Sequence, residues 1–438
     1  MNKFLPIKNK KIGILGAGQS GIAAAELAYE LEANVFVSDM NEKNKINFKG
    51  KIQAEFGCHS KKILDSDFII KSPGISRKSK IMKEILDSSI PIVSELEFAS
   101  WFTKSFIIAL TGTNGKTTTV ELINKILSDY GLKTFLGGNI GIPFSTNVLK
   151  EICNKNNKNN NFHILEVSSF QLEDIKYFKP NIAIILNITP DHLDRYESFL
   201  DYYNTKLNII KNQDKDDHII INKCIDINKK SNSNVIKFFI SSGKIFINDL
   251  EKMIDLETVK LIGSHNFENI TAASIVSDLC GVNEKSMINT INNFIPLAHR
   301  LERINIQSNK NYYNDSKATN LSSTIAALES IGNNIILILG GIDKNLDDFT
   351  DLKKYKNKIK HVVLYGLSRD RIKNQINSFV NVSDFKFFKN AIQKSIELSN
   401  SYDNILLSPA CASFDQFKNY KERGNFFKEI ILKHYDAN

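Results

Sequence analysis

The chain of 438 residues has few cysteines and no long apolar segment. Its five cysteines are scattered and form no CxxC pair, which predicts free thiols in a reducing cytoplasm. No apolar run approaches the roughly 18 residues of a membrane span, so we expect no transmembrane helix. The first residues, MNKFLPIKNKK, contain neither an apolar core nor a small-residue cleavage site, so we expect no signal peptide.

The net charge of +9 is not concentrated in any dense basic stretch. Lysine and arginine are spread along the chain, so we expect no nucleic-acid partner, and small anionic substrates suit a positive protein equally well. The hydrophobic share of 42% and the charged share of 24% are typical of a soluble globular protein. The length allows two or three domains.

The stretch 106–119 (FIIALTGTNGKTTT) predicts a nucleotide-phosphate site. An apolar strand leads into a glycine loop, and a helix with one apolar face follows. Glycines let backbone N–H groups approach an anion, and the helix N-terminus adds positive potential. Lys116 can reach the outer phosphates and the Thr117 hydroxyl can bind Mg²⁺. Leu110 stands where a standard P-loop has glycine, so this loop is a shortened variant; the alternative is an ordinary strand-to-helix turn with a surface lysine.

A second glycine motif lies near the N-terminus. A predicted strand at 11–15 is followed by 16–21 (GAGQSG), which matches GxGxxG, and by an Ala-rich helix from Ile22. The next strand ends in Asp39, about 20 positions on. The motif alone does not distinguish NAD from another nucleotide diphosphate. A later strand ends in the turn Ser72-Pro73-Gly74, at the edge where open α/β sheets bind ligands.

Polar side chains also follow predicted strands in the middle of the chain. Glu166 lies near the end of one strand, where a carboxylate beside a phosphate loop can hold Mg²⁺. Asp191, His192 and Asp194 follow the next strand, where catalytic groups collect, although helix capping also explains them. Lys206 lies on a predicted helix and reads as a surface lysine on the sequence alone.

Four further segments complete the pattern. Residues 137–141 (GGNIG) predict a loop, with or without a ligand nearby, and residues 154–161 (NKNNKNNN) predict a disordered surface loop. Residues 265–269 (HNFEN) begin a predicted helix whose first turn can face a bound base or phosphate, although capping is an alternative. Beyond Pro296 strands alternate with helices and end in polar groups, so we expect a third α/β sheet.

These patterns predict an α/β fold of three domains. We expect an N-terminal Rossmann-like domain over residues 1–101, a central P-loop-type ATP-binding domain with a mostly parallel sheet over 102–296, and a C-terminal Rossmann-like α/β domain over 297–438. A kinase needs one nucleotide site and one acceptor, whereas a ligase needs ATP and two substrates. Three modules therefore favour a ligase.

The chain resembles the Mur ligase family in a set of motifs that cover essentially its whole length. The motifs are TGTNGKTTT, EVSSFQL, NITPDHLDR, HNFEN, HRLE, NDSKATN, LGGIDKN and SPACASFDQFKNYKERG. TGTNGK and TPDHLDR are shared with a wider superfamily that includes folylpolyglutamate synthase, whereas EVSSFQL, NDSKATN and SPACASFDQF resemble the D-glutamate-adding branch. The resemblance implies a cytoplasmic, monomeric enzyme of peptidoglycan synthesis, and hence of cell-wall formation and cell division. It would join D-glutamate to UDP-N-acetylmuramoyl-L-alanine through an acyl phosphate, using ATP and two Mg²⁺ ions.

The resemblance also assigns roles to individual residues. The catalytic set is Lys116, Glu166, His192, Lys206 and Lys317. The ATP contacts are Gly112, Thr113, Asn114, Gly115, Lys116, Thr117, Thr118, Asn269, Arg300 and Asp315. The magnesium ligands are Thr117, Glu166, His192 and Lys206, the last as a carbamate formed with CO₂. The contacts to the UDP-substrate are Gln19, Ser20, Asp39, Gly74 and Asn139. The D-glutamate contacts are Thr319, Lys344, Ser413, Phe414 and Tyr420.

The chain departs from the family pattern at Met40, Asn41, Phe414 and Tyr420, where we expect the uracil and amino-acid contacts to differ. Three alternatives remain open. They are a folate-type ligase, a nucleotide-binding regulatory protein that has lost turnover, and an NAD-dependent dehydrogenase suggested by GxGxxG alone.

Overall fold

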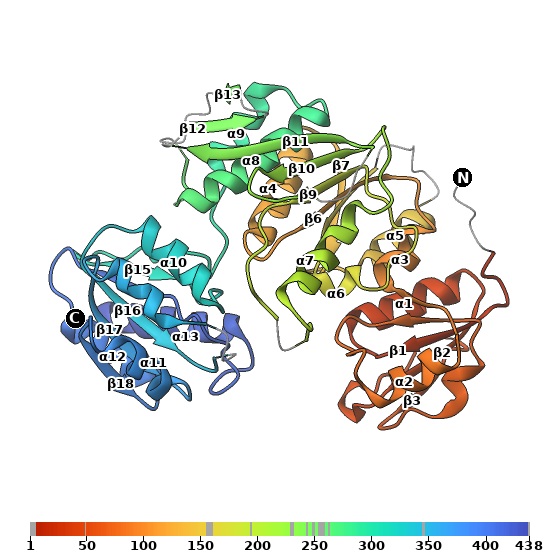
Figure 1. Ribbon diagram of the computed structural model, residues 1–438, viewed down its shortest axis with the longest axis horizontal. Coiled ribbons are helices and arrows are strands. Elements are labelled where there is room, and N and C mark those ends of the chain that lie inside the picture. Colours follow the sequence, from red (N-terminus) through yellow and green to blue (C-terminus); the bar gives the residue numbers. More distant parts are fainter. Residues whose placement is uncertain are drawn as a thin grey trace. The chain divides into compact units, whose positions relative to one another are not determined.

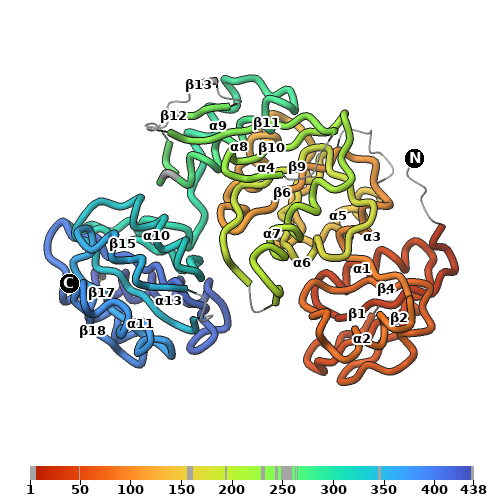
Figure 2. Tube along the Cα trace, in the orientation of Figure 1, coloured from red at the N-terminus to blue at the C-terminus, as the bar shows by residue number. Residues whose placement is uncertain are grey.

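A computed structural model of the protein contains three α/β sheets, which follow one another along the chain (Figures 1 and 2). The structure describes residues 6–48, 50–154, 161–192, 195–227, 232–241, 244–247, 250–252, 259–261, 263–343 and 347–436. The chain packs as two compact units, Met1–Lys252 with Asn269–Ile291 and Met253–Glu268 with Asn292–Asn438. The predicted three-domain α/β architecture is confirmed. The domain boundaries after residues 101 and 296 stay predictions.

The N-terminal sheet has five parallel strands in the order β3-β2-β1-β4-β5. Its strands are β1 (Lys11–Leu15), β2 (Asn34–Asp39), β3 (Gln53–Phe56), β4 (Phe68–Lys71) and β5 (Ile92–Ser94). Its helices are α1 (Gln19–Glu30), α2 (Lys80–Asp87) and α3 (Glu95–Ser100), with short 3₁₀ turns at Glu42–Asn44 and Lys61–Asp65. After Lys11 every residue of β1 is buried, as in a parallel strand covered on both faces. The predicted order of strand, glycine loop and helix is confirmed, and the helix begins three residues before Ile22.

The central sheet has eight strands in the order β13-β12-β11-β10-β9-β6-β8-β7. They are β6 (Phe106–Thr111), β7 (Lys133–Gly138), β8 (Asn161–Glu166), β9 (Ile182–Ile185), β10 (His218–Asn222), β11 (Asn234–Ser241), β12 (Lys244–Ile247) and β13 (Leu250–Lys252). The strands from β11 to β7 are parallel, and β12 and β13 add an antiparallel edge. Because β6, β8 and β9 are neighbours, the loops that follow them meet at one edge of the sheet.

Helices cover the central sheet and join it to the first one. They are α4 (Lys116–Asp129), α5 (Phe144–Cys153), α6 (Ser169–Leu172), α7 (Phe199–Leu207), α8 (Ser264–Leu279) and α9 (Glu284–Asn293), with a 3₁₀ turn at Asn208–Ile210. Helix α1 of the N-terminal sheet packs against α5 and α3 (Figure 1). One continuous apolar core therefore runs from Ile12 and Ala24 through Phe144 and Val148 to Leu165.

The C-terminal sheet has six strands in the order β14-β15-β19-β16-β17-β18, parallel except for the pair β14 and β15. They are β14 (Glu302–Arg303), β15 (Asn311–Asn314), β16 (Ile335–Gly340), β17 (Ile359–Tyr365), β18 (Val382–Phe385) and β19 (Asn404–Leu407). The helices are α10 (Leu321–Ser330), α11 (Arg369–Ile376), α12 (Phe388–Leu398) and α13 (Tyr420–Asp436), with a 3₁₀ turn at Phe349–Tyr355. Apolar clusters lie on both faces of this sheet. None of the helices in the described ranges has the length and apolarity that crossing a membrane requires.

The glycine-rich segment 137–141 differs from the prediction of a loop, because Gly137 and Gly138 are the last two residues of β7. A Cβ on Gly138 would come within 2.3 Å of the Glu166 carbonyl oxygen, and φ at Gly138 is 104°. Glycine therefore serves here to bring β7 close to the end of β8. Most of the predicted disordered loop at 154–161, together with Asp194 and Lys344, lies outside the described residues.

Candidate active site

The predicted phosphate loop between β6 and α4 requires glycine at position 115. Gly115 has φ 82°, in the left-handed region, and a Cβ there would come within 2.4 Å of Asn269 Oδ1. Asn269 belongs to α8, is 2% exposed, and accepts a hydrogen bond from Thr119 Oγ1 at 3.1 Å. The structure thus brings together two predicted ATP contacts that are separated by more than a hundred residues in the chain.

Asn187, which follows β9, fixes the other half of the loop. Its Oδ1 accepts hydrogen bonds from the backbone N–H groups of Thr113 (3.1 Å) and Asn114 (2.8 Å). Its Nδ2 donates to the Asn114 carbonyl at 3.2 Å. The sequence analysis gave Asn187 no role, and the only available signal was its place as the first residue of NITPDHLDR. We infer that Asn187 holds the loop in shape.

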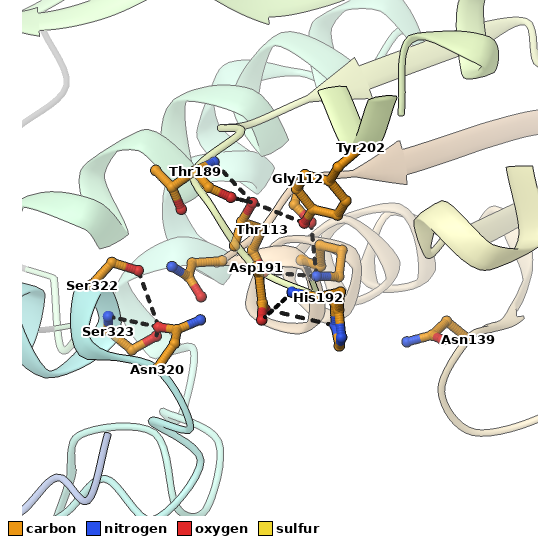
Figure 3. Close-up of polar contacts among 12 residues, drawn as sticks. Gly112, Thr113, Asn139, Thr189, Asp191, His192, Tyr202, Asn320, Ser322 and Ser323 are labelled. Atoms are coloured by element: carbon orange, nitrogen blue, oxygen red, sulfur yellow. Dashed lines mark hydrogen bonds and ion pairs between the residues drawn. The ribbon is translucent and has the colours of Figure 1, made fainter. Parts of the chain in front are cut away.

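Thr113 lies between Thr189 and Tyr202 (Figure 3). Its hydroxyl donates to the Thr189 carbonyl at 3.0 Å, accepts from the Thr189 N–H at 3.0 Å, and lies 3.1 Å from the Tyr202 hydroxyl. A threonine hydroxyl offers one donor and two acceptor positions, so these three contacts use it fully. Burial raises the pKa of Tyr202, which therefore stays neutral. Tyr202 is a second residue at this site that the sequence analysis did not identify.

Two lysines converge on one carbonyl oxygen at this loop. Lys116 Nζ donates to the carbonyl oxygens of Gly112 (2.8 Å) and Thr113 (2.9 Å), and Lys206 Nζ donates to the Gly112 carbonyl at 2.9 Å. Lys206 is 2% exposed, so the interpretation as a surface lysine is wrong. Burial first, and then the charge of Lys116, hold the pKa of Lys206 well below its ordinary value. Lys206 therefore loses its proton more readily than an exposed lysine.

Glu166 lies at the end of β8 with both carboxylate oxygens in use. Oε2 accepts from the Thr117 hydroxyl at 2.8 Å, and Oε1 accepts from Asn139 Nδ2 at 2.9 Å. A hydroxyl and a carboxylate oxygen this close, at the start of a helix, form a donor pair that suits Mg²⁺. In the part of the chain that the structure describes, no group of three or more His, Cys, Asp or Glu side chains is arranged to hold a metal.

Asp191 and His192 follow β9 on the loop after Thr189. Asp191 Oδ1 accepts the backbone N–H of His192 at 2.9 Å, and the His192 ring Nε2 lies 3.7 Å from Asp191 Oδ2 (Figure 3). His192 has φ 55°, a strained value for a residue other than glycine, and its side chain is 39% exposed. Its ring packs edge-on against Phe170, with 4.9 Å between ring centroids. The imidazole is thus accessible on one side and contacts Phe170 on another.

The predicted UDP-substrate contacts of the first sheet lie at the carboxyl ends of β1, β2 and β4. Asp39 Oδ2 accepts from the Ala17 N–H at 2.6 Å and from Asn44 Nδ2 at 3.0 Å, and Oδ1 accepts from the Asn41 N–H at 2.7 Å. Burial alone would raise the pKa of Asp39, but these hydrogen bonds outweigh it and lower the pKa. Asp39 therefore braces the glycine loop next to Gln19 and Ser20.

The turn that contains Gly74 is tied to the same loop. Ser72 Oγ donates to the Gly16 carbonyl at 3.0 Å, which joins the end of β4 to the end of β1. Asn139 lies elsewhere in the same compact unit. Besides its side-chain contact, its backbone N–H donates to the Glu166 carbonyl at 2.7 Å. The structure thus gathers four of the five predicted UDP-substrate contacts at the edge of the first sheet and places the fifth at the edge of the central sheet.

Asp315 follows β15 in the second compact unit. Its Oδ1 accepts the Leu301 N–H at 3.1 Å, and its Oδ2 lies 2.8 Å from Ser408 Oγ. Burial raises the pKa of Asp315 to about 7, against the lowering effects of these hydrogen bonds and of the Arg300 charge. Arg300, the other ATP contact predicted in this unit, is therefore close enough to act on Asp315 electrostatically.

Arg423, fully buried on α13, joins the two loops that hold the predicted amino-acid contacts. It donates to the carbonyl oxygens of Ser316 (2.8 Å) and Cys411 (3.0 Å) and to the Tyr365 hydroxyl (3.1 Å). Lys317 Nζ lies 4.2 Å from the centre of the Tyr420 ring. Lys317 and Tyr420 are thus brought together.

The remaining predicted D-glutamate contacts differ in their exposure to solvent. Ser413 is 3% exposed, Phe414 is 70% exposed, and Thr319 is half-buried. Thr319 precedes Asn320, which caps α10 by accepting from the Ser323 N–H at 3.0 Å and from the hydroxyls of Ser322 and Ser323 (Figure 3). Ligand roles of all these residues stay predictions.

Family models match most of the chain. The MurD N-terminal domain matches residues 11–81, the Mur ligase middle domain matches 110–277, and the Mur ligase, glutamate ligase domain matches 299–411. Among curated relatives, the UDP-N-acetylmuramoylalanine–D-glutamate ligase of Elusimicrobium minutum is 40% identical, covering 98% of this chain and 99% of the relative. The ligase of the same name from Christiangramia forsetii is 38% identical, covering 96% of this chain and 99% of the relative.

Solved structures agree on the fold. MurF ligase from Thermotoga maritima in complex with ADP gives a TM-score of 0.62 at 14% identity, covering 99% of this chain and 98% of that one. A pseudomurein peptide ligase type C from Methanothermus fervidus gives 0.61 at 17% identity, covering 97% of this chain and all of that one. At these identities the likeness concerns the fold alone, whereas the sequence relatives decide the family. The chain belongs to the Mur ligase family and, within it, to the UDP-N-acetylmuramoylalanine–D-glutamate ligases.

Proposed function

We propose that the protein is an ATP-dependent amide ligase that adds D-glutamate to UDP-N-acetylmuramoyl-L-alanine, a step of peptidoglycan synthesis. The observation that carries the proposal is the convergence of Lys116, Thr117, Glu166 and Lys206 around one phosphate loop. These residues come from three different elements, β8, α4 and α7, and a plain strand-to-helix turn would not need them together.

The reaction follows from the weakness of a carboxylate as an electrophile. An oxygen of the L-alanine carboxylate attacks the γ-phosphorus of ATP, and ADP leaves. The amine of D-glutamate then attacks the acyl carbon, inorganic phosphate leaves, and the amine gives up a proton as the amide forms. The transferring phosphoryl group carries concentrated negative charge, so nearby cations supply most of the stabilisation.

Lys116 and the start of α4 serve this purpose in the proposal. Lys116 would exchange the carbonyl oxygens of Gly112 and Thr113 for the outer phosphates of ATP, and backbone N–H groups of the first helical turn would bind the phosphate chain. Asn269 would contact the base, and Arg300 and Asp315 the phosphates and ribose.

The donor set at Glu166 fits Mg²⁺, and we propose that two ions bind. Thr117 and Glu166 would hold one ion, and His192 and a carbamate on Lys206 would hold the other. Bound Mg²⁺ would supply charge neutralisation at the phosphate oxygens. In this chain, Asn139 orients the Glu166 carboxylate, and Asp191 fixes the backbone of His192.

Lys206 suits carbamate formation because its pKa is low. The neutral Nζ forms a bond to the carbon of CO₂ and loses a proton, so the amine becomes an anionic carbamate. The carbamate places an anion beside the Lys116 ammonium, so the two groups attract each other. The centre of the Tyr202 ring lies 4.8 Å from Lys206 Nζ.

The GxGxxG loop would bind the UDP group in this proposal. Asp39, which contacts ribose in NAD-dependent folds, here has its oxygens occupied by Ala17, Asn41 and Asn44. Gln19, Ser20, Asp39, Gly74 and Asn139 would contact the UDP-substrate, and Lys317, Thr319, Lys344, Ser413, Phe414 and Tyr420 the D-glutamate. We further propose that the enzyme is cytoplasmic and monomeric.

An amino-acid specificity assay tests the function. ADP release should require UDP-N-acetylmuramoyl-L-alanine and D-glutamate together. Equal turnover with L-alanine or meso-diaminopimelate would place the protein elsewhere in the family. ADP release with a folate acceptor instead of the UDP-sugar would favour the folate-type ligase, and ATP binding without any ADP release would favour the regulatory protein.

A further inference from the structure

Five charged side chains form a cluster between the first and central sheets of the first compact unit. Lys71, at the end of β4, is 1% exposed and pairs with Glu173 (3.2 Å) and Asp174 (3.0 Å). Arg77 pairs with Asp174 from the solvent side, and Arg195 lies 3.4 Å from Glu173. Burying charged groups costs desolvation free energy, which can exceed the attraction between them. Stability alone therefore does not explain this cluster.

Arg195 is the member that touches both predicted ligand regions. Its guanidinium donates to the Ile75 carbonyl at 3.2 Å, in the turn that contains Gly74. The same group stacks on the Phe170 ring, with 3.9 Å from Cζ to the ring centroid. Arg195 therefore holds a backbone oxygen of the UDP-substrate turn on one side and an aromatic ring of the central domain on the other.

Phe170 continues the connection to His192. Its ring contacts the His192 ring edge-on at 4.9 Å and stacks on Tyr196 at 6.0 Å with 15° between the planes. The Tyr196 hydroxyl donates to Glu173 Oε1 at 3.2 Å, which closes the ring of contacts back to Arg195. The His192 ring thus contacts Phe170, Phe170 stacks against Arg195, and Arg195 donates to the Ile75 carbonyl.

We propose that Arg195 is a positioning residue that couples occupancy of the UDP-substrate turn to the orientation of His192. The inference rests on the proposed function, because it takes the turn at Gly74 as part of the UDP-substrate site and His192 as part of the metal and ATP site. A UDP-substrate that contacts the turn fixes the Ile75 carbonyl. Arg195 and Phe170 then hold the His192 imidazole in the orientation that binds the magnesium complex of ATP.

The guanidinium is suited to this task where an ammonium is not. It is planar, so one face can stack on Phe170 while its edge donates to two acceptors, Ile75 and Glu173. A lysine would keep the charge and lose the stack. Coupling between two ligands through such a contact is measurable as a ratio of dissociation constants.

Calorimetry on the full chain tests the proposal. The dissociation constant of the magnesium complex of a non-hydrolysable ATP analogue is measured with and without saturating UDP-N-acetylmuramoyl-L-alanine. In the wild type we expect the UDP-substrate to lower this constant by at least about fivefold, the lower end of ordinary coupling. In Arg195→Lys and in Phe170→Leu we expect a ratio near one, while each ligand alone binds as in the wild type.

Arg77→Gln is the matched control, because Arg77 is half exposed and pairs only with Asp174 among the contacts described here. It should keep the wild-type ratio. A wild-type ratio of one, an unchanged ratio in Arg195→Lys, or an equal loss of coupling in Arg77→Gln would each overturn the proposal. Failure of the proposed function would show separately, as absence of ADP release dependent on D-glutamate in the wild type.

Discussion

The buried carboxyl of Asp315 makes the stability of the second compact unit depend on pH in an unusual direction. Its pKa is raised from 3.8 to about 7 by burial. Between these values the folded chain keeps a proton on Asp315 that the unfolded chain gives up. Because the folded state binds more protons, the free energy of unfolding falls as the pH rises through this window, and the contribution is complete only below about pH 4.

The size of the effect follows from the two pKa values. A difference of about 3 pH units corresponds to about 4 kcal/mol at most, at 1.36 kcal/mol per unit. Ser408 Oγ donates to Asp315 Oδ2 at 2.8 Å, and this hydrogen bond favours the charged carboxylate. Burial opposes it and raises the pKa, because the charged form loses its hydration inside the protein.

Asp315→Asn tests this reasoning, because an amide has a similar shape and stays uncharged at every pH of the experiment. We expect the variant to match the wild type at pH 4 and to exceed it by up to about 4 kcal/mol at pH 8. The measurement is urea unfolding at several pH values, with hydrogen exchange of peptides from β15 and β19 as the local readout. Asp370→Asn, at a side chain 71% exposed in the same unit, serves as control and should leave the pH profile unchanged. Parallel profiles for the wild type and Asp315→Asn would refute the argument.

Three further outcomes are expected. Lys206→Ala should lose activity and recover part of it with added acetate, measured as ADP release; full activity without an additive would show that Lys206 has no role near the metal. Gly115→Ala should weaken binding of an ATP analogue, measured by calorimetry, because strain of about 1–3 kcal/mol and a clash with Asn269 distort the loop; unchanged affinity would contradict this. Lys71→Met should cost about 3 kcal/mol in urea unfolding, since it leaves buried acidic partners, and Lys71→Met/Asp174→Asn should cost less than the sum of the single variants; strict additivity would show that the two are not coupled.

Local patterns were enough for some elements of the fold, but they did not identify β3, β7, β18 or the strands from β10 to β13. β1 and β6 are short buried runs that lead into glycine loops, and the predicted sequence of strands and helices around them is confirmed. The prediction failed at Gly137 and Gly138, where glycine was interpreted as a loop signal. Glycine also permits close strand pairing, and which of the two applies depends on a neighbour that the local sequence does not identify.

The sequence by itself determined the family and the three-domain α/β fold, because both depend on motifs and periodicity within short stretches. Only the tertiary structure decided how the residues act on one another. Lys206 has a low pKa because α7 buries it beside Lys116, and Asn187 shapes a loop more than seventy residues away. Arg195 likewise connects two residues that lie far apart in the sequence, Ile75 and Phe170. Burial and contact depend on how close distant parts of the chain come in the folded protein. The spacing of residues along the sequence does not give these distances.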